Sequence, residues 1–290
     1  MKILVTGSNG FIGKNIVNYL VENTEHIIIC TYHNNNNNNN NNNKNKNKNK
    51  KIKYAYFDLN NIPSINFKSC GYPDMLIHCA WEGYRDIYSL NHITVNFFNS
   101  YLWIEKLISE GLKNVVCIGS AFECGLINGE LNENINTKPN TSYSVAKDSL
   151  RKSLELLTKD SNVTFKWLRV FNVFGKDQHP KTLFGLLDTA ILEKKTTFKM
   201  SGGEQLRDYI DIEDLAIMIT RVSLQNKING VINCCSGTPV SIRKLVEQYL
   251  VQRNVEMELD LGFYPYPEYE PMAYWGSVEK LNTVITSVYD

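Results

Sequence analysis

The sequence predicts an α/β protein with a doubly wound parallel sheet and a smaller carboxyl-terminal lobe. Two observations lead to this fold class. Through residues 1–175, short apolar runs alternate with stretches of helical spacing, and a glycine-rich turn joins the first run to the first helix. Such alternation produces βαβ units, because parallel neighbouring strands need a crossover connection. The strands expected after the first lie at 27–31, 54–57, 75–79, 115–118 and 165–170, and the helices near 14–22, 93–110 and 143–159.

The first expected strand, residues 3–5, runs into the motif T-G-x-x-G-x-x-G at residues 6–13. In this order Gly7 allows a tight turn, Gly10 lets the backbone approach a pyrophosphate, and Gly13 lets the next helix pack close to the sheet. The N–H groups at the start of that helix favour an anion. Such a turn can also be only a turn, but its place between a strand and a helix predicts a Rossmann-type dinucleotide site formed by Gly7, Asn9, Gly10, Phe11, Ile12 and Gly13.

The composition fits one large domain or two unequal ones, because 43% of the 290 residues are hydrophobic and can bury a large core. After about residue 176 the alternation loosens into prolines, aromatic residues and short elements. We therefore expect a dinucleotide-binding domain over residues 1–175 and a mainly substrate-binding lobe over 176–290, with some segments returning to the first domain. A binding cleft between them would lie at the carboxyl ends of the strands.

The charge is unevenly distributed along the chain. An asparagine run at 34–43 continues into alternating lysine and asparagine, and residues 34–53 hold six lysines and no acid. The net charge of +1 falls to −5 when these six lysines are left out, so the rest is mildly acidic. With nothing apolar to bury, residues 34–50 are expected to form a disordered loop. Contact with a nucleic acid is the alternative, but a short Lys/Asn run is usually only solvated, and we expect no nucleic-acid partner.

The sequence also predicts whether the chain spans a membrane, where the protein is located and whether it binds a metal. No run of about eighteen apolar residues occurs, so we expect no membrane-spanning helix and no membrane partner. The first strand begins almost directly after Met1, which leaves no room for a signal peptide. The seven cysteines, an odd number mostly within apolar runs, indicate reduced thiols in a cytoplasmic protein, and no C-x-x-C or His/Cys spacing indicates a metal.

The stretch TSYSVAKDSL places Tyr143 four residues before Lys147, which puts both side chains on one face of a helix. A phenol titrates near pH 10, and a nearby ammonium lowers its pKa by favouring the phenolate. Taken alone, Tyr-x-x-x-Lys is usually an ordinary surface pair. Its place downstream of the glycine turn, with CIGSAFECG ending a strand in between, favours an acid–base role instead.

Together these motifs resemble those of an extended short-chain dehydrogenase/reductase of the NAD-dependent epimerase/dehydratase family, over nearly the whole chain. After the glycine turn come Asp58-Leu59, LIHCAW at 76–81 where the family often has H-L-A-A, and SAFECG with the Tyr/Lys pair. Later, LRVFNVFG resembles the family's L-R-x-x-N-V-Y-G, and GGEQLRDYIDIEDLA resembles its G-x-x-x-R-D-x-x-x-V-x-D. Each motif is only moderately specific, but their order is characteristic.

The resemblance implies roles for the matching residues. Tyr143 would exchange a proton with the sugar oxygen at the reacting carbon. Lys147 would lower the phenol pKa and hold the nicotinamide ribose, and Ser120 would hydrogen-bond the same sugar oxygen. Beyond the glycine turn, the cofactor-binding positions implied are Thr31, Asp58, Leu59, Cys79, Ala80, Asn96, Tyr143 and Lys147.

The substrate implied is a nucleotide sugar. Asn172 and Arg207 resemble residues that meet its diphosphate, and a guanidinium fork suits that anion. A salt bridge from Arg207 to Asp208 or Asp211 is the alternative, and Ser120 has the alternative of a serine that only faces the core. The family often dimerises through two helices, which here would lie near 93–110 and 143–159, so a homodimer is expected.

Departures from the family pattern reduce the number of reactions that the chain could catalyse. Dehydratases of the family carry Asp-Glu directly after the catalytic residue, but Ala121-Phe122 follow Ser120 here, and neither can act as an acid or base. The short ending with E-P-M resembles deoxysugar 4-ketoreductases of the abequose-synthase type, which favours reduction at C4 of the sugar. A C4 epimerase with tightly bound NAD is the alternative. A non-catalytic dinucleotide-binding regulator is the second alternative.

The choice of cofactor depends on the end of the second strand. NAD-specific sites usually have an acid there, which binds the ribose 2′-hydroxyl and repels a 2′-phosphate. This chain has Thr31, Tyr32 and His33, followed by the lysine-containing tract. We therefore expect NADP(H) to be favoured over NAD(H), with dual use as the alternative.

Overall fold

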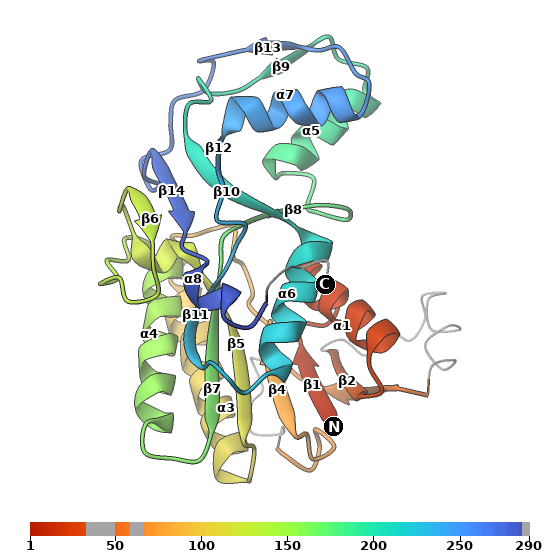
Figure 1. The fold of residues 1–290 in the computed structure, drawn as a ribbon, viewed down its shortest axis with the longest axis vertical. Coiled ribbons are helices and arrows are strands. Elements are labelled where there is room, and N and C mark those ends of the chain that lie inside the picture. Colours follow the sequence, from red (N-terminus) through yellow and green to blue (C-terminus); the bar gives the residue numbers. More distant parts are fainter. Residues whose placement is uncertain (33–49, 59–65, 286–290) are drawn as a thin grey trace.

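The structure is a computed structural model that describes residues 1–32, 50–58 and 66–285. Figure 1 shows a lower part built around one large sheet and an upper part with a second sheet. Residues 34–49 of the Asn/Lys tract lie outside the described residues, so the expected disorder of that loop stays a prediction. Leu59, one of the expected cofactor contacts, lies outside them as well.

The lower part contains a parallel sheet of seven strands, and its order is β11-β7-β5-β4-β1-β2-β3. The chain starts at its centre with β1, adds β2 and β3 on one side, and then returns to add the others on the opposite side. This is the doubly wound arrangement expected from the sequence, and the fold class is confirmed. The strands are β1 (Lys2–Thr6), β2 (Ile27–Tyr32), β3 (Ile52–Tyr56), β4 (Met75–His78), β5 (Asn114–Ser120), β7 (Thr164–Val170) and β11 (Gly230–Cys234).

Strand β1 illustrates why the strands of this sheet are continuous apolar runs. Successive side chains of a strand point to opposite faces. Ile3 and Val5 belong to the core on one face, and Leu4 belongs to the core on the other. Both faces are covered by helices (Figure 1), so side chains on both faces are buried and most of them are apolar. Helices α1 (Phe11–Asn23) and α6 (Ile212–Leu224) lie on one side, and α3 (Phe98–Ser109) and α4 (Ser142–Thr158) lie on the other.

Two of these helices begin in a way that the spacing of apolar residues did not predict. The helix expected near 93–110 starts as a π-helical stretch, η3 (His92–Phe97), and continues as α3. Helix α4 starts with a capping box, in which the Thr141 hydroxyl accepts from the Ser144 N–H and Ser144 bonds back to Thr141. This cap fixes the first turns of α4, from which Tyr143 and Lys147 project.

The upper part contains a mixed sheet of five strands. Its order is β12-β10-β14-β6, and β8 pairs with β10. A two-stranded sheet and two helices complete this part. The elements are β6 (Gly129–Leu131), β8 (Asn172–Phe174), α5 (Leu183–Leu192), β9 (Thr197–Lys199), β10 (Leu206–Asp211), β12 (Pro239–Ser241), α7 (Ile242–Gln252), β13 (Glu258–Asp260) and β14 (Ala273–Gly276). A short helix, α8 (Glu279–Asn282), follows near the end of the described chain.

Buried polar side chains join the two sheets. The Asn233 amide nitrogen at the end of β11 donates to the carbonyls of Leu131 on β6, at 2.8 Å, and Ser277, at 3.2 Å. Asp208 on β10 accepts from the N–H groups of Ser236, Gly237 and Gly276 at 2.8 to 3.2 Å. The carboxyl ends of β1, β4 and β5 therefore face an upper sheet that is held to the lower one.

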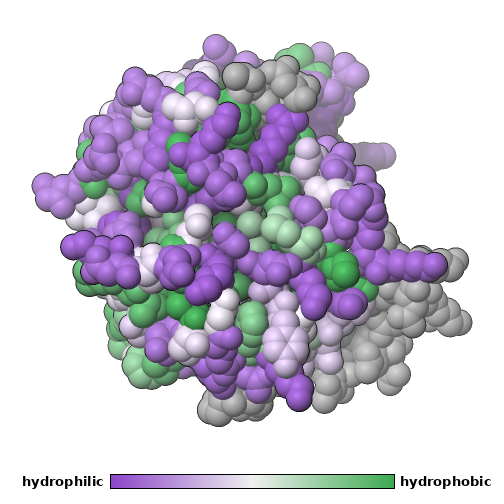
Figure 2. All heavy atoms as spheres, turned by 60° about the horizontal axis from the view of Figure 1, so that its bottom comes forward, coloured by the Kyte–Doolittle hydropathy of each residue, from purple (hydrophilic) through white to green (hydrophobic). Residues whose placement is uncertain are grey.

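The face of the molecule in Figure 2 is mostly hydrophilic, and hydrophobic side chains form small separate areas between the polar ones. In the part of the chain that the structure describes, no helix combines the length and the apolar character needed to span a membrane.

Candidate active site

The glycine turn brings β1, α1 and the segment after β4 close together. Gly7 has a φ of 63°, and a Cβ on it would lie 2.9 Å from the Ala80 nitrogen. A Cβ on Gly13 would lie 2.3 Å from the Gly7 oxygen. The Gly10 N–H donates to that same oxygen at 2.8 Å. Side chains at Gly7 and Gly13 would therefore push the turn apart.

The start of α1 presents backbone N–H groups. Gly10 is its N-cap residue, and no side-chain hydrogen bond caps it there. Asn9 and Gly10 are exposed, whereas Phe11 and Ile12 are partly buried. The first N–H groups of a helix have no partner within the helix and carry the positive end of its dipole. This turn is therefore suited to a pyrophosphate.

A buried hydrogen-bond chain fixes the segment after β4 against β1. The Thr6 hydroxyl accepts from the N–H groups of Cys79, at 3.1 Å, and Ala80, at 3.2 Å, so its hydrogen is directed to His78 Nδ1 at 2.9 Å. His78 Nε2–H then donates to the Ser100 hydroxyl at 3.1 Å. Burial lowers the pKa of His78 to about 3, which keeps the ring neutral.

The end of β2 has no acid of its own, but one lies nearby. Thr31 is buried, and its carbonyl accepts from the Ser8 hydroxyl at 2.9 Å. The Tyr32 ring packs edge-on against Tyr56 at 5.9 Å, and the Tyr56 hydroxyl donates to Asp58 at 3.3 Å. The expected contacts Thr31 and Asp58 thus lie near the carboxyl ends of the paired strands β2 and β3.

Tyr143 and Lys147 lie at the carboxyl end of β5. Lys147 Nζ is buried, donates to the Ile118 carbonyl at 2.9 Å, and lies 3.9 Å from the centre of the Trp81 ring. Tyr143 is partly buried, and the neighbouring Ser120 side chain acts to lower the pKa of its phenol. The structure therefore brings Ser120, Tyr143 and Lys147 into one site, although 23 residues separate Ser120 from Tyr143 in the sequence.

The electrostatics of this pair differ from the expectation that Lys147 lowers the phenol pKa. Burial raises the pKa of Tyr143 above its usual value, and the Ser120 side chain lowers it only in part. The pKa of Lys147 is lowered to about 8, because burial disfavours the ammonium. The ammonium is directed at the Ile118 carbonyl and the Trp81 ring, which explains why it does not offset the burial of the phenol.

Aromatic side chains surround Tyr143, and the sequence analysis assigned none of them a role. The rings of Trp81, His92 and Phe122 pack edge-on against the Tyr143 ring, with centres 6.0, 5.3 and 6.3 Å away. His92 Nδ1 accepts from Trp81 Nε1 at 3.1 Å, and burial lowers the His92 pKa. The sequence had drawn attention to Trp81, at the second Ala position of the family's H-L-A-A, and to Phe122, after Ser120, but not to His92.

Asn96, an expected cofactor contact, holds a loop in this structure. Its amide accepts from the Glu82 N–H at 3.2 Å and donates to the Glu82 carbonyl at 2.8 Å. Both bonds fix the chain just after Trp81. Asn96 therefore contacts the backbone next to Trp81, and Trp81 packs against Tyr143.

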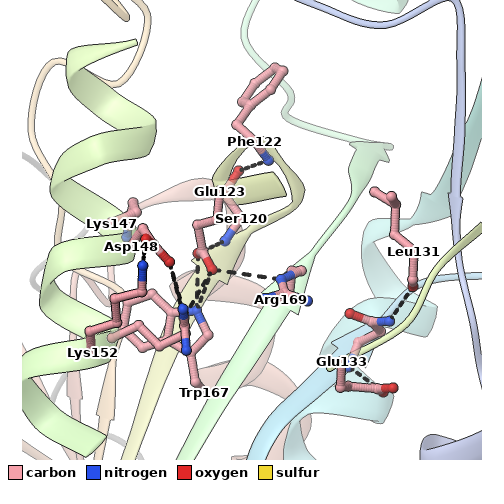
Figure 3. A network of polar contacts seen from close by, with 12 residues as sticks. Ser120, Phe122, Glu123, Leu131, Glu133, Lys147, Asp148, Lys152, Trp167 and Arg169 are labelled. Carbon is pink, nitrogen blue, oxygen red and sulfur yellow. Dashed lines mark hydrogen bonds and ion pairs between the residues drawn. The ribbon is translucent and has the colours of Figure 1, made fainter. Parts of the chain in front are cut away.

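Ser120 is held by Glu123, a residue that the sequence analysis did not identify (Figure 3). The Glu123 carboxylate is fully buried and accepts from the Ser120 N–H at 2.7 Å and from Trp167 Nε1 at 3.0 Å. Glu123 belongs to the 3₁₀ helix η4 (Ala121–Cys124), which follows β5 directly. Its acidic side chain points into the core, and the side chain that contacts the Tyr143 ring is Phe122.

Arg207 and Asn172 lie in the upper sheet. The Arg207 guanidinium is buried and donates through Nε, at 3.1 Å, and Nη2, at 2.7 Å, to Glu270, and it stacks 4.6 Å from the Tyr274 ring centre. The Asn172 amide donates to the Asp208 carbonyl at 3.1 Å and accepts from the Tyr274 hydroxyl at 3.2 Å. The salt-bridge partner of Arg207 is thus Glu270, and neither of the acids considered from the sequence.

The residue before Glu270 links this region to the surroundings of Tyr143. The neighbouring Tyr269 packs against the Phe122 ring with centres 6.4 Å apart, and its carbonyl accepts from the Asn140 amide at 3.4 Å. The wall of the site therefore runs from Tyr143 through Phe122 and Tyr269 to the Arg207–Glu270 pair.

Comparison with known proteins shows which family the chain belongs to. The sequence profile described as the NAD dependent epimerase/dehydratase family matches residues 3–235, which is most of the chain. The chain belongs to the NAD dependent epimerase/dehydratase family. The resemblance read from the motifs is thereby confirmed.

Relatives in the NAD dependent epimerase/dehydratase family include two sugar-nucleotide enzymes. The chain is 27% identical over 281 residues to dTDP-6-deoxy-L-talose 4-dehydrogenase (NAD(+)) of Aggregatibacter actinomycetemcomitans, covering 96% of this chain and 100% of that protein. It is 27% identical over 260 residues to a putative UDP-glucose 4-epimerase of Methanocaldococcus jannaschii, covering 84% and 80% of the two chains.

A solved structure has the same fold. UDP-glucuronic acid 4-epimerase from Bacillus cereus, determined with UDP-glucuronic acid and NAD, superposes with a TM-score of 0.83 at 24% identity, covering 99% of this chain and 93% of that one. The backbone cradle described above fits a dinucleotide of this kind, because Gly7 and Gly13 have no room for a Cβ and the start of α1 has no side-chain cap.

Proposed function

We propose that this protein is an NAD(P)-dependent oxidoreductase that transfers a hydride at C4 of a nucleotide-linked deoxysugar, acting as a 4-ketoreductase. The observation that carries the proposal is that Ser120, Tyr143 and Lys147 meet at the end of β5. This site lies in a chain that aligns over nearly its whole length with a nucleotide-deoxysugar 4-dehydrogenase.

Each of the three residues has a task in this reaction. A reduced dinucleotide held at the glycine turn would supply a hydride to C4. The Tyr143 phenol donates its proton to the oxygen on C4, so that the ketone becomes an alcohol and the phenol becomes a phenolate. The Ser120 hydroxyl, next to that phenol, gives a second hydrogen bond to the same oxygen. The Lys147 ammonium, four residues further along the same helix, would add positive charge on the side of the new phenolate.

The substrate's diphosphate is assigned to the upper sheet. Arg207 is the buried cation there, and its fork geometry suits two phosphate oxygens. The sugar would lie along the aromatic wall from Phe122 to Tyr143. Loss of water is not part of the proposal, because Phe122 occupies the place next to Tyr143 and the Glu123 carboxylate faces the core.

A C4 epimerase is the second candidate, and the 4-epimerases among the relatives favour it. Both reactions use the same hydride transfer, so they differ in their net consumption of cofactor. The test is to incubate the purified protein with a panel of nucleotide-linked 4-ketosugars and to follow the absorbance of the reduced nicotinamide. Stoichiometric oxidation supports the reductase, whereas interconversion of C4 epimers with copurified NAD supports the epimerase. Failure to act on any sugar in the panel would leave the non-catalytic regulator.

We also propose that the cofactor is NADP(H) rather than NAD(H), because the described end of β2 carries no carboxylate and the sequence continues into the lysine-containing tract. The comparisons do not support this preference, since the family description and the printed name of the talose dehydrogenase give NAD. Titrating NADH and NADPH against the protein at low and moderate salt tests it. Tighter binding of NADH at both salt concentrations would overturn the preference, and Asp58 beside Tyr56 would then be the acid to replace first.

A homodimer in the cytoplasm also belongs to the proposal. Helices α3 and α4 expose apolar side chains that suit a helix-to-helix contact, with Phe98 54%, Leu102 39% and Leu156 74% exposed. Light scattering of the purified protein measures the oligomeric state. A monomer at micromolar concentration would exclude a stable dimer. The cytoplasmic location rests only on the thiol-rich composition.

A further inference from the structure

We propose that Glu123 is a positioning residue, whose buried carboxylate holds the backbone of Ser120 and thereby aims the Ser120 hydroxyl at the reacting oxygen. This inference rests on the proposed function, because it assigns Ser120 its task. It adds a residue that contacts neither substrate nor cofactor and acts only through Ser120.

Two hydrogen bonds join Ser120 to the first turn of η4. The Glu123 carboxylate accepts from the Ser120 N–H at 2.7 Å, and the Ser120 hydroxyl accepts from the Phe122 N–H at 3.3 Å. Together these bonds form the capping box of η4. Ser120 is therefore fixed at its N–H and at its hydroxyl, and its side chain has little freedom to rotate.

The carboxylate is itself fixed from the far side by β7. Trp167 Nε1 donates to both carboxylate oxygens at 3.0 Å, and the guanidiniums of Arg169 and Arg151 lie 3.6 and 3.9 Å away. All of these partners donate or are cationic, so they suit the ionised form of Glu123. They also oppose the effect of burial, which raises the Glu123 pKa.

The local sequence makes room for this arrangement. A Cβ at Gly119 would lie 2.1 Å from Trp167 Nε1 and 2.8 Å from a carboxylate oxygen of Glu123. Only glycine at that position lets the indole and the carboxylate meet directly behind Ser120. Figure 3 shows the two side chains converging there, between β5 and β7.

The hydrogen-bond network around Glu123 ends on the surface of α4 at Glu155, which is a matched control for Glu123. Arg151 Nη1 binds Glu155 at 2.8 Å, and the Glu155 side chain is 36% exposed. Glu123 and Glu155 thus share an arginine partner and allow the same chemical change to glutamine. Only Glu123 accepts a hydrogen bond from Ser120.

The test is a double-mutant cycle measured on the holoenzyme with whichever nucleotide sugar it turns over. We expect Glu123→Gln to lower kcat about 10- to 100-fold with an unchanged Kd for the cofactor, and Glu155→Gln to stay within about twofold of the wild type. In the Ser120→Ala background, Glu123→Gln should cost no more than about a further twofold, because its effect passes through Ser120. Equal losses in both backgrounds would overturn the proposal, since a merely structural role is additive.

A second measurement does not need a substrate. Because Glu123 is the acceptor of the Ser120 N–H, hydrogen exchange of that amide in the cofactor-bound protein should become faster in Glu123→Gln and remain unchanged in Glu155→Gln. If the single variant fails to fold, Glu123→Gln/Arg169→Gln removes both buried charges together, and the same two measurements apply. An unchanged exchange rate overturns the positioning role. A wild-type protein without turnover overturns the proposed function, and the exchange measurement then still decides this inference.

Discussion

Ser120 at the end of β5 and Arg207 in the upper sheet have been assigned to opposite ends of the same substrate, yet they are held in different ways. Ser120 is bonded to a carboxylate three residues away, which is fully buried and bonded in turn to β7. Arg207 is bonded to a carboxylate 63 residues away, in the segment before β14, and that side chain is 18% exposed.

The difference follows from what each end has to do. A group that meets the reacting atoms must be in place before the substrate arrives, because reorganising it during the reaction raises the barrier. A group that binds a diphosphate can instead exchange one anion for another. The Glu270 carboxylate holds the Arg207 guanidinium in position and neutralises it, and a bound diphosphate would take over those hydrogen bonds. On the proposed assignment, we expect the catalytic end to be rigid and the anchoring end to exchange its partner.

The strongest test of the catalytic end is Tyr143→Phe. The ring keeps its contacts with Trp81, His92 and Phe122, but the proton donor is lost. We expect kcat to fall about 10³-fold, with cofactor affinity nearly unchanged. Steady-state kinetics and a cofactor titration measure the two effects, and full turnover by the variant would remove Tyr143 from the mechanism.

The anchoring end is tested by Arg207→Gln. Without the guanidinium, binding of the substrate's nucleoside diphosphate should weaken about 30-fold, while kcat at saturating substrate changes much less. Calorimetry with the free nucleoside diphosphate measures this directly. Arg243→Gln is the matched control, because Arg243 is an exposed arginine that pairs with Glu247 within one helix. Equal affinities of the two variants would mean that the diphosphate binds elsewhere.

Glu270→Gln tests whether the Glu270 carboxylate competes with the substrate's diphosphate for Arg207. If it does, removing its charge should tighten binding of the nucleoside diphosphate about tenfold. The gain should disappear in the Arg207→Gln background and shrink as salt is raised. Weaker binding in Glu270→Gln would show instead that the carboxylate is needed to orient Arg207, and the two ends would then be equally rigid.

The pH dependence should come from the catalytic end. The Lys147 pKa is lowered to about 8 in the folded protein, so its ammonium is present below that pH and is lost as the pH rises through it. We expect kcat/KM for the sugar to decline by up to about tenfold between pH 7 and 9. Lys147→Met should have a lower value and should lack this decline. A decline of the same size in that variant would assign the titration to another group.

The comparison also separates what the sequence determined from what only the tertiary structure decided. The glycine turn, the continuous apolar strands and the Tyr/Lys spacing were readable, because each is a local pattern with a fixed physical reason: a missing Cβ, burial on both faces, or one helical turn. These patterns predicted the doubly wound sheet, and they identified Tyr143 and Lys147 four residues apart in α4.

Side-chain partners from distant elements were not readable in this way. Glu123 was within the SAFECG motif, but only the pairing of β5 with β7 brings Trp167 and Arg169 to its carboxylate. Acids adjacent in sequence, Asp208 and Asp211, were considered for Arg207, whereas the fold delivers Glu270. Tertiary structure decided these partners, because hydrogen bonds and ion pairs form only between atoms a few ångströms apart. The order of the strands in the sheets and the paths of the connecting segments set those distances, independently of separation along the sequence.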